Sequence, residues 1–366
     1  MATHSIALIP GDGIGKEVVP AAQHVLDFTA KTVGGFRLKY TTYPWGCEWY
    51  LKNGKMMPED GLEQLRQHDA IFLGAVGFPG VPDHVSLWGL LLPIRRDFHQ
   101  YVNLRPVKLL NGIESPLRGK GCEHIDFWVV RENNEGEYSN MGGRLYAGQP
   151  QETVVQNAVF TRFGVERIIR YAFTLARQKG KQRHVTSATK SNGINFTMPF
   201  WDEMFKAIAS EYPDCSTDSC HIDALAARFI THPERFDVVV ASNLFGDILT
   251  DLGAAIAGSI GIAPSANINP EREYPSMFEP VHGSAPDIAG LGVANPVGQV
   301  WSGAMMLEHL GHAKAAQILM AAVEQVLVGG VKTADIGGSA STDEVTEAIC
   351  EAIAALHDSP LARPQH

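Results

Sequence analysis

The sequence is poor in cysteine, in positive charge and in long apolar runs. Its 5 cysteines, scattered over 366 residues, argue against a disulfide framework and are typical of a reducing compartment. The 30 lysines and arginines stand against 40 aspartates and glutamates, so the net charge is −10 and no broad basic face is expected for nucleic acid. No apolar run has the length of a membrane span, and no charged leader follows Met1. We therefore expect a cytoplasmic enzyme that binds neither nucleic acid nor a membrane.

Two common motifs are also missing. Cys215, Cys220 and His221 lie close together, but no second cysteine pair completes a zinc site. The turn GDGIG has glycines at 11, 13 and 15, which is not the GxGxxG spacing of a dinucleotide-binding Rossmann unit. The sequence therefore favours a tight turn between a strand and a helix at this point.

Short apolar runs alternate with helical patterns, which predicts an α/β fold with a largely parallel sheet. Strands are expected at His4–Pro10 and Ala70–Leu73. The stretch Asn133–Gln151, rich in glycine and asparagine, and the strand expected at Thr153–Thr161 predict a projecting β arm. Pro264–Pro296 reads as a proline-rich connection that is too long to be an idle loop.

One stretch places two acids where a metal could bind. Phe236–Ser242 reads as a buried strand, and the helix expected after Phe245 carries Asp247 and Asp251 one turn apart on one face. Such a pair suits Mg²⁺ or Mn²⁺, which take oxygen ligands. Acidic residues are also common at the positive end of a helix dipole. The spacing alone leaves both explanations open.

Several basic residues are further candidates. Arg95, Arg105 and Arg131 occur in otherwise apolar segments, and converging guanidinium groups would hold a polycarboxylate substrate. Most arginines are merely solvated at the surface, and Lys190, in SATKSNG, reads by itself as a surface lysine. The spacing of these residues does not distinguish a binding site from a solvated surface.

Six segments in order resemble the β-decarboxylating dehydrogenases, the family of isopropylmalate and isocitrate dehydrogenases. The segments are IPGDGIG, NLRP, RENNEGEY, TKSN, NLFGDILTD and EPVHGSAPDIAG, and the resemblance spans nearly the whole chain. It implies an isopropylmalate dehydrogenase-like fold that is not a Rossmann fold. Its two α/β domains would be a large cofactor-binding domain (1–102 and 256–366) and a central dimerisation domain (103–255) with the β arm at about 133–161. The active site would lie in the cleft between these domains.

The segments SLWGLLLPIRR and VRENNEGEYSNMGGR are closest to the branch of the family that acts on tartrate and D-malate. The resemblance implies NAD-dependent, metal-dependent oxidation of tartrate and oxidative decarboxylation of D-malate to pyruvate and CO₂, by hydride transfer from C2, with K⁺ as activator. A 3-isopropylmalate dehydrogenase, or another β-decarboxylating 2-hydroxyacid dehydrogenase, is the alternative within the family. A catalytically inactive regulatory homologue is the alternative outside enzymes, although all the expected catalytic residues are present.

The resemblance also implies roles for single residues. Asp247 and Asp251 of one subunit and Asp223 of the other would hold Mn²⁺ or Mg²⁺, so the protein would be a homodimer with shared active sites. Lys190 would be the base and Tyr138 would protonate the enol at C3. Without the resemblance, Tyr138 is equally well explained as an arm residue at the dimer contact.

The same resemblance assigns the substrate and cofactor contacts. The substrate-binding residues would be Arg95, Arg105 and Arg131. The cofactor-binding residues would be Ala75, Glu279, His282, Gly283, Ser284, Ala285, Asp287, Ile288 and Asn295. Asp287 favours NAD over NADP, because a carboxylate accepts hydrogen bonds from ribose hydroxyls and repels a 2′-phosphate. A turn or capping histidine remains a reasonable alternative for His282.

Overall fold

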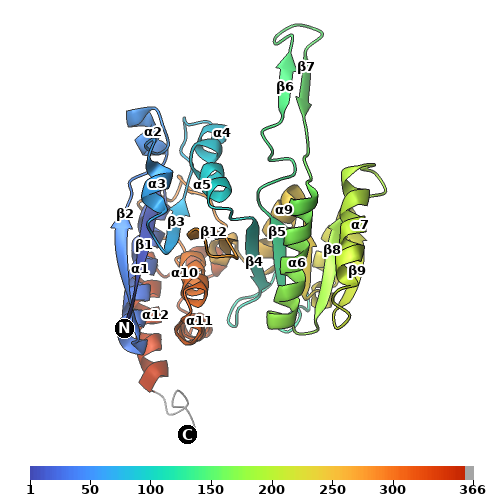
Figure 1. The fold of residues 1–366 in the computed structure, drawn as a ribbon. Helices are drawn as coiled ribbons and strands as arrows, with labels where there is room; N and C mark the ends of the chain where they lie inside the picture. Colours follow the sequence, from blue (N-terminus) through green and yellow to red (C-terminus); the bar gives the residue numbers. More distant parts are fainter. Residues whose placement is uncertain (359–366) are drawn as a thin grey trace. The chain divides into compact units, whose positions relative to one another are not determined.

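The computed structural model describes residues 1–358, which form two compact units (Figure 1). Unit 1 comprises Met1–Gln100, Lys108–Cys122 and the chain from Ala254 onward, and unit 2 comprises Tyr101–Val107 and Glu123–Gly253. Residues 108–122, which the sequence-based division places in the central domain, belong to unit 1, where Lys108 forms an ion pair with Glu324 at 2.9 Å. No helix in the described range is long and apolar enough to cross a membrane.

The strands of unit 1 follow the order β2-β1-β3-β12-β11. They are β1 (Ala2–Gly11), β2 (Phe36–Thr42), β3 (Ala70–Ala75), β11 (Pro264–Ile268) and β12 (Ser276–Pro280). Neighbouring strands are parallel, except for the antiparallel pair β11–β12. The prediction of a connection at Pro264–Pro296 is therefore wrong for the first half of this segment, which forms β11 and β12. Buried polar residues interrupt the apolar pattern of these two strands, so the pattern does not predict the strands. The residues are Ser265, Asn267 and Ser276.

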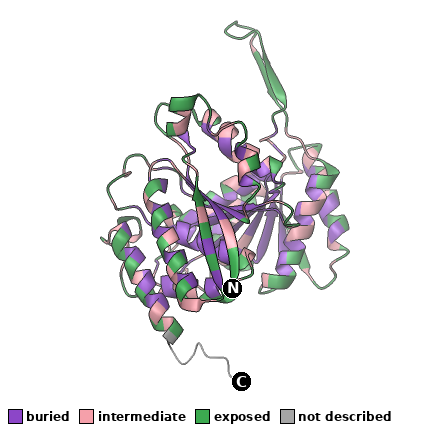
Figure 2. Cartoon of the chain, turned by 60° about the vertical axis from the view of Figure 1, so that its left-hand side comes forward, coloured by how far each residue is buried: buried purple, intermediate pink, exposed green. Residues whose placement is uncertain are grey.

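The central strands of this sheet are buried on both faces (Figure 2), whereas the edge strand β2 exposes alternate residues. Ala7, Ile9, Ile71 and Leu73 belong to one apolar cluster, and the alternate residues of β1 and β3 are equally buried on the opposite face. The helices of unit 1 are α1 (Gly15–Val33), α2 (Cys47–Asn53), α3 (Gly61–Leu65), α4 (Asp83–Ser86), α5 (Leu92–Asp97), α10 (Val297–His309), α11 (Ala313–Val328) and α12 (Thr342–Asp358). A π-helical turn, Leu87–Leu91, joins α4 to α5.

The strands of unit 2 follow the order β4-β5-β10-β8-β9. They are β4 (Val102–Lys108), β5 (Asp126–Glu132), β10 (Val238–Ala241), β8 (His184–Thr189) and β9 (Ser216–His221). The pairs β5–β10, β10–β8 and β8–β9 are parallel, so the carboxyl ends of these four strands meet at one edge. The helices are α6 (Arg162–Lys179), α7 (Thr197–Ala209), α8 (Ile222–Thr231) and α9 (Asn243–Ile256).

A hairpin of β6 (Gly142–Leu145) and β7 (Thr153–Gln156) extends from the rest of unit 2 (Figure 1). Every residue of its two strands is exposed. The predicted fold class, an α/β protein with a mostly parallel sheet and a projecting arm, is confirmed.

Candidate active site

Asp247, on α9, is bound by two side chains of unit 2. Nη1 of Arg131, at the end of β5, forms an ion pair with its Oδ1, and the Tyr138 hydroxyl donates to its Oδ2 at 2.8 Å. The Arg131 guanidinium also lies 5.6 Å from the centre of the Tyr138 ring. The Arg131 side chain is only 4% exposed and that of Asp247 is 36% exposed. A buried cation, a carboxylate and a phenol therefore meet at one point.

Asn243, the first residue of α9, holds this arrangement together. Its Oδ1 accepts hydrogen bonds from Nε and Nη2 of Arg131 at 3.0 and 2.7 Å, and its Nδ2 donates to the Glu135 carbonyl at 3.0 Å. We call Arg131, Tyr138, Asn243 and Asp247 the Asp247 cluster. Because Asn243 is buried, its amide fixes both Arg131 and the backbone that leads to Tyr138.

Gly246, one residue before Asp247, leaves room for Arg131. A Cβ atom there would lie 2.5 Å from Cγ of Arg131 and 2.6 Å from its Cβ. Neither Gly246 nor Asn243 is among the site residues predicted from the sequence, although both belong to the NLFGD segment. Both residues contact Arg131, which lies more than 100 residues away in the chain, so no local pattern marks them.

Glu132 supports the turn between Arg131 and Tyr138. The backbone amides of Asn134 and Glu135 donate to its carboxylate at 2.8 to 3.1 Å. The side chain is fully buried, and this burial raises the pKa of Glu132 to about 7. The sequence analysis did not single out this residue either.

Arg105 and Asp251 extend the cluster along α9. Nη1 of Arg105 donates to Oγ1 of Thr250 at 2.6 Å and lies 3.7 Å from Oδ1 of Asp251. Burial raises the pKa of Asp251, with the Asp247 charge adding to this effect and Arg105 opposing it. The structure thus brings together Arg105, Arg131, Asp247 and Asp251, four of the residues to which the family resemblance assigns substrate or metal binding.

Lys190 and Asp223 form a separate pair. Lys190 directly follows β8, and Asp223 is the second residue of α8. Nζ of Lys190 donates to Oδ1 of Asp223 at 2.8 Å. This hydrogen bond lowers the pKa of Asp223, whose side chain is 68% exposed. Within residues 1–358, no three His, Cys, Asp or Glu side chains of one chain are grouped to hold a metal. Asp223 therefore does not complete a three-carboxylate site within its own chain.

Arg95 belongs to unit 1, where it pairs with a predicted cofactor residue. Its Nη2 lies 2.7 Å from Oε1 of Glu279, and both side chains are 9% exposed. Asn267 donates to the same oxygen at 2.7 Å. Within the described chain, Nε of Arg95 is buried without a partner.

The loop after β12 rests on the GDGIG turn of unit 1. The Ile14 amide donates to the Ser284 carbonyl at 2.8 Å. Gly13 has a φ of +52°, and a Cβ there would lie 2.0 Å from that carbonyl oxygen. The Cβ of a residue at 283 would meet nothing within 4 Å, so Gly283 borders open space. The carbonyl of Ala75, at the end of β3, accepts the Asp12 amide at 2.7 Å beside this turn.

The other predicted cofactor residues differ in their surroundings. His282 is buried and its pKa is lowered by burial; Nδ1 lies 3.0 Å from the Gly283 carbonyl, and Nε2 has no partner within the described range. Asn295 donates to Asp335 at 3.1 Å. Ile288 packs with Ala285 against an apolar cluster, whereas Asp287 is exposed.

Comparisons with known proteins identify the family. The family model described as isocitrate/isopropylmalate dehydrogenase matches residues 5–349. A probable tartrate dehydrogenase/decarboxylase of Bacillus subtilis is 57% identical over 97% of this chain and 99% of its own length. The D-malate dehydrogenase [decarboxylating] of Escherichia coli is 57% identical over 96% of this chain and 99% of its own. The crystal structure of isocitrate dehydrogenase from Methylococcus capsulatus superposes with a TM-score of 0.86, at 36% identity over 96% of this chain and 99% of that one.

Proposed function

The chain belongs to the isocitrate/isopropylmalate dehydrogenase family, and we propose that it oxidises tartrate and oxidatively decarboxylates D-malate, with NAD and a divalent metal. One observation carries the proposal. Arg131, Asp247 and Tyr138 are joined in one cluster, which combines a carboxylate-binding cation, a metal-type ligand and a proton donor. The names of the two relatives described above support the choice of substrates.

Substrate binding is assigned to the arginines. Arg105 and Arg131 are nearly buried and lie along α9, so their forked N–H donors are held in place for a carboxylate. Arg95, from unit 1, contributes a third guanidinium. A tartrate or malate carries two carboxylates, which suit the forked donors of these arginines.

The donor set of unit 2 fits Mg²⁺ or Mn²⁺. Asp247 and Asp251 lie one turn apart on α9 and offer hard oxygen ligands. The raised pKa of Asp251, due first to burial and also to the Asp247 charge, indicates a carboxylate pair that a cation would stabilise. Asp223 of a second subunit supplies the third ligand. The bound metal acidifies the C2 hydroxyl and stabilises negative charge on oxygen.

Lys190 and Tyr138 transfer the protons. Lys190 would remove the proton of the C2 hydroxyl, and NAD, when bound, would supply the hydride acceptor for C2. After CO₂ leaves, Tyr138 donates its phenolic proton to C3. The hydrogen bond from Tyr138 to Asp247 holds the hydroxyl beside the substrate.

NAD is assigned to the loop after β12. Gly283 and Ser284 offer backbone near open space for the diphosphate, while the neutral His282, with an unpaired ring nitrogen, and Asn295 contact the adenosine. The exposed Asp287 accepts hydrogen bonds from the ribose hydroxyls and disfavours a 2′-phosphate. The remaining cofactor contacts are Ala75, Glu279, Ala285 and Ile288.

The active unit is a homodimer. Asp223 is exposed, and residues 1–358 contain no group of three His, Cys, Asp or Glu side chains that could hold a metal, so we assign Asp223 of a second copy to the site with Asp247 and Asp251. Ile230 on α8 and Ile248 on α9 are 45% and 53% exposed, and such apolar surface favours a subunit contact near these residues.

Steady-state assays test the function. D-malate and the tartrate isomers are compared with 3-isopropylmalate and isocitrate, each with NAD and NADP, after chelation and readdition of Mg²⁺ or Mn²⁺. We expect turnover of D-malate and tartrate with NAD, lost on chelation and higher in K⁺ than in Na⁺. Turnover confined to 3-isopropylmalate or isocitrate would contradict the substrate assignment.

A further inference from the structure

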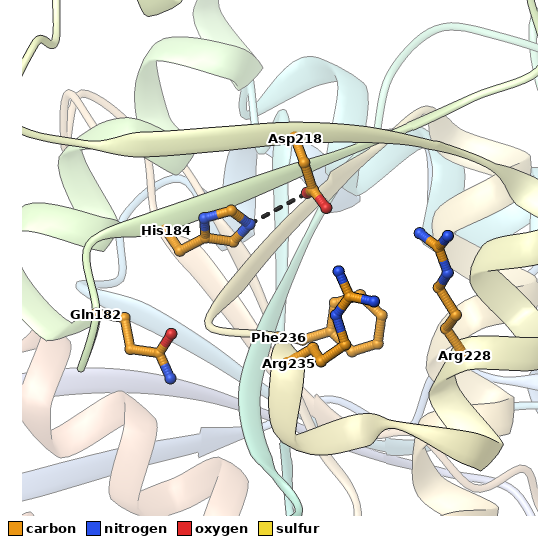
Figure 3. Close-up of a pocket in the computed structure, with 6 residues that line it drawn as sticks. All are labelled: Gln182, His184, Asp218, Arg228, Arg235 and Phe236. Atoms are coloured by element: carbon orange, nitrogen blue, oxygen red, sulfur yellow. Dashed lines mark hydrogen bonds and ion pairs between the residues drawn. The ribbon is translucent and has the colours of Figure 1, made fainter.

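A polar cavity in unit 2, outside the proposed active site, has a volume of about 370 Å³. Figure 3 shows the residues that line it. Its lining comes from the start of β8, from β9, from α8 and from the turn before β10. The residues are Gln182, His184, Asp218, Arg228, Arg235 and Phe236. None of them belongs to the proposed active site.

The cavity is remote from Lys190. His184 begins β8, whereas Lys190 follows the last residue of that strand. At about 3.3 Å per residue, six residues of extended chain separate the two Cα atoms by about 20 Å. The cavity therefore lies toward the amino ends of the parallel strands, and the proposed catalytic residues lie beyond their carboxyl ends.

Two guanidinium groups at the cavity form no ion pair with a carboxylate of residues 1–358, although the charge of Arg235 helps to lower the pKa of Asp218. Within residues 1–358, neither Arg228 nor Arg235 lies within 4.0 Å of an acidic oxygen, and Nη1 of Arg228 donates only to the Cys220 sulfur, at 3.2 Å. Arg170 and Arg177 of the same unit instead form ion pairs with Glu211 and Asp214, at 2.7 and 2.5 Å. Because a guanidinium carries five N–H donors, Arg228 and Arg235 keep several donors for a ligand.

The one acid in the lining is engaged by a histidine. Nε2 of His184 lies 3.1 Å from Oδ1 of Asp218 (Figure 3), and Nδ1 lies 2.8 Å from Oγ of Ser216. This bond to His184 is the main reason why the pKa of Asp218 is lowered. The cavity thus has two arginines against one carboxylate, in a chain whose net charge is −10.

We propose that this cavity binds a phosphate group, either as inorganic phosphate or on a small metabolite. Arginine forks donate two parallel hydrogen bonds to phosphate oxygens, and two arginines match its double negative charge. The volume exceeds that of a single phosphate ion and is typical of sites for small metabolites. The assignment does not depend on the proposed dehydrogenase function.

Calorimetric titration of the full-length protein with inorganic phosphate, at constant ionic strength, tests the site. We expect saturable binding that Arg228→Gln together with Arg235→Gln weakens at least about tenfold, because each lost bidentate contact removes a strong charge-assisted pair. Arg177→Gln, which removes an arginine outside the cavity, is the matched control and keeps wild-type binding. Arg235→Lys retains the charge without the fork and gives intermediate binding.

Two further titrations separate the sources of the phosphate. Glycerol 3-phosphate binding as tightly as inorganic phosphate shows recognition of the phosphate alone, and tighter binding of the ester shows a metabolite site. Turnover is measured in parallel, and the double variant keeps it. The proposal is overturned if phosphate binding is absent, if it is unchanged in the double variant, or if succinate binds equally well.

Discussion

The Asp247 cluster and the Lys190–Asp223 pair both lie beyond the carboxyl ends of parallel strands in unit 2, yet they differ in burial and in partners. Arg131 is 4% exposed and is held by Asn243 and Asp247. Lys190 is 29% exposed, Asp223 is 68% exposed, and the two side chains form an ion pair with each other.

This difference distinguishes the side-chain geometry that a single chain determines from the geometry that it does not. The cluster is pre-organised, because a guanidinium, an amide and a carboxylate restrain one another around a buried arginine. The pair lacks such restraint, and its ion pair contributes little at an exposed position. We infer that the pair acquires its geometry from a second subunit.

Removing the central carboxylate should produce the largest effect. Asp247→Asn takes a negative charge from Arg131 and from the metal site, so we expect kcat/KM for D-malate to fall by about 10³-fold. Asp214→Asn, which breaks an exposed ion pair with Arg177 in the same unit, should leave kcat/KM unchanged. An Asp247→Asn variant with near wild-type turnover would remove Asp247 from the mechanism.

Glu132, the buried residue that supports the turn before Tyr138, should make the stability of the protein depend on pH. Between its ordinary pKa of 4.5 and its folded pKa of about 7, Glu132 keeps a proton in the folded protein that the unfolded chain has lost. Stability therefore falls as pH rises through this window and levels off above it, by about 3 kcal/mol in total.

Glu132→Gln keeps a carbonyl acceptor for the two backbone amides but cannot ionise. Its free energy of unfolding should therefore lack this decline, and the variant should gain on the wild type as pH rises from 5 to 8. Urea titrations at matched protein concentration measure the difference. A constant difference between the two proteins at all four pH values of 5, 6, 7 and 8 would contradict the role of Glu132.

Asn243→Ala should loosen the cluster. It leaves Arg131 and the Glu135 carbonyl short of buried partners, so we expect a loss of about 2 kcal/mol in the free energy of unfolding and a lower kcat. Asn243→Asp retains the acceptor for Arg131 and loses the donor to Glu135. Compared with Asn243→Ala, this variant should bring KM closer to its wild-type value than kcat. Only the backbone that leads to Tyr138 loses its hydrogen bond.

A matched asparagine controls for general destabilisation. Asn111 is exposed and donates to Glu324, so Asn111→Ala should change stability and turnover little. Equal effects of the two alanine variants would contradict a positioning role for Asn243.

The sequence predicts those features that local patterns and long motifs determine. Alternating strands and helices indicate the fold class, and four of the residues assigned from motifs, Arg105, Arg131, Asp247 and Asp251, lie together along α9, whereas Arg95 and Asp223 do not. Asn243 and Gly246 escaped attention because an asparagine and a glycine at the start of a helix have many ordinary uses.

The remaining features depend on contacts between distant segments. Arg95 and Glu279 are 184 residues apart in the chain, and no local pattern predicts that they pair. The strands β11 and β12 are hidden for a similar reason, because the polar residues buried in them find partners only after packing, as Asn267 does with Glu279.

Mixing two inactive variants tests directly whether the pair and the cluster come from different subunits. Asp223→Asn and Asp247→Asn, coexpressed with different tags, form dimers of which half contain one of each. In such a dimer, one site carries both substitutions and the other carries none. Activity should therefore recover to about a quarter of the wild-type value. Asp247→Asn with Asp251→Asn is the matched control, because both acids lie on α9 of the same subunit and every site stays damaged. Recovery in the first mixture alone supports shared sites, whereas recovery in neither shows that Asp223 serves its own chain.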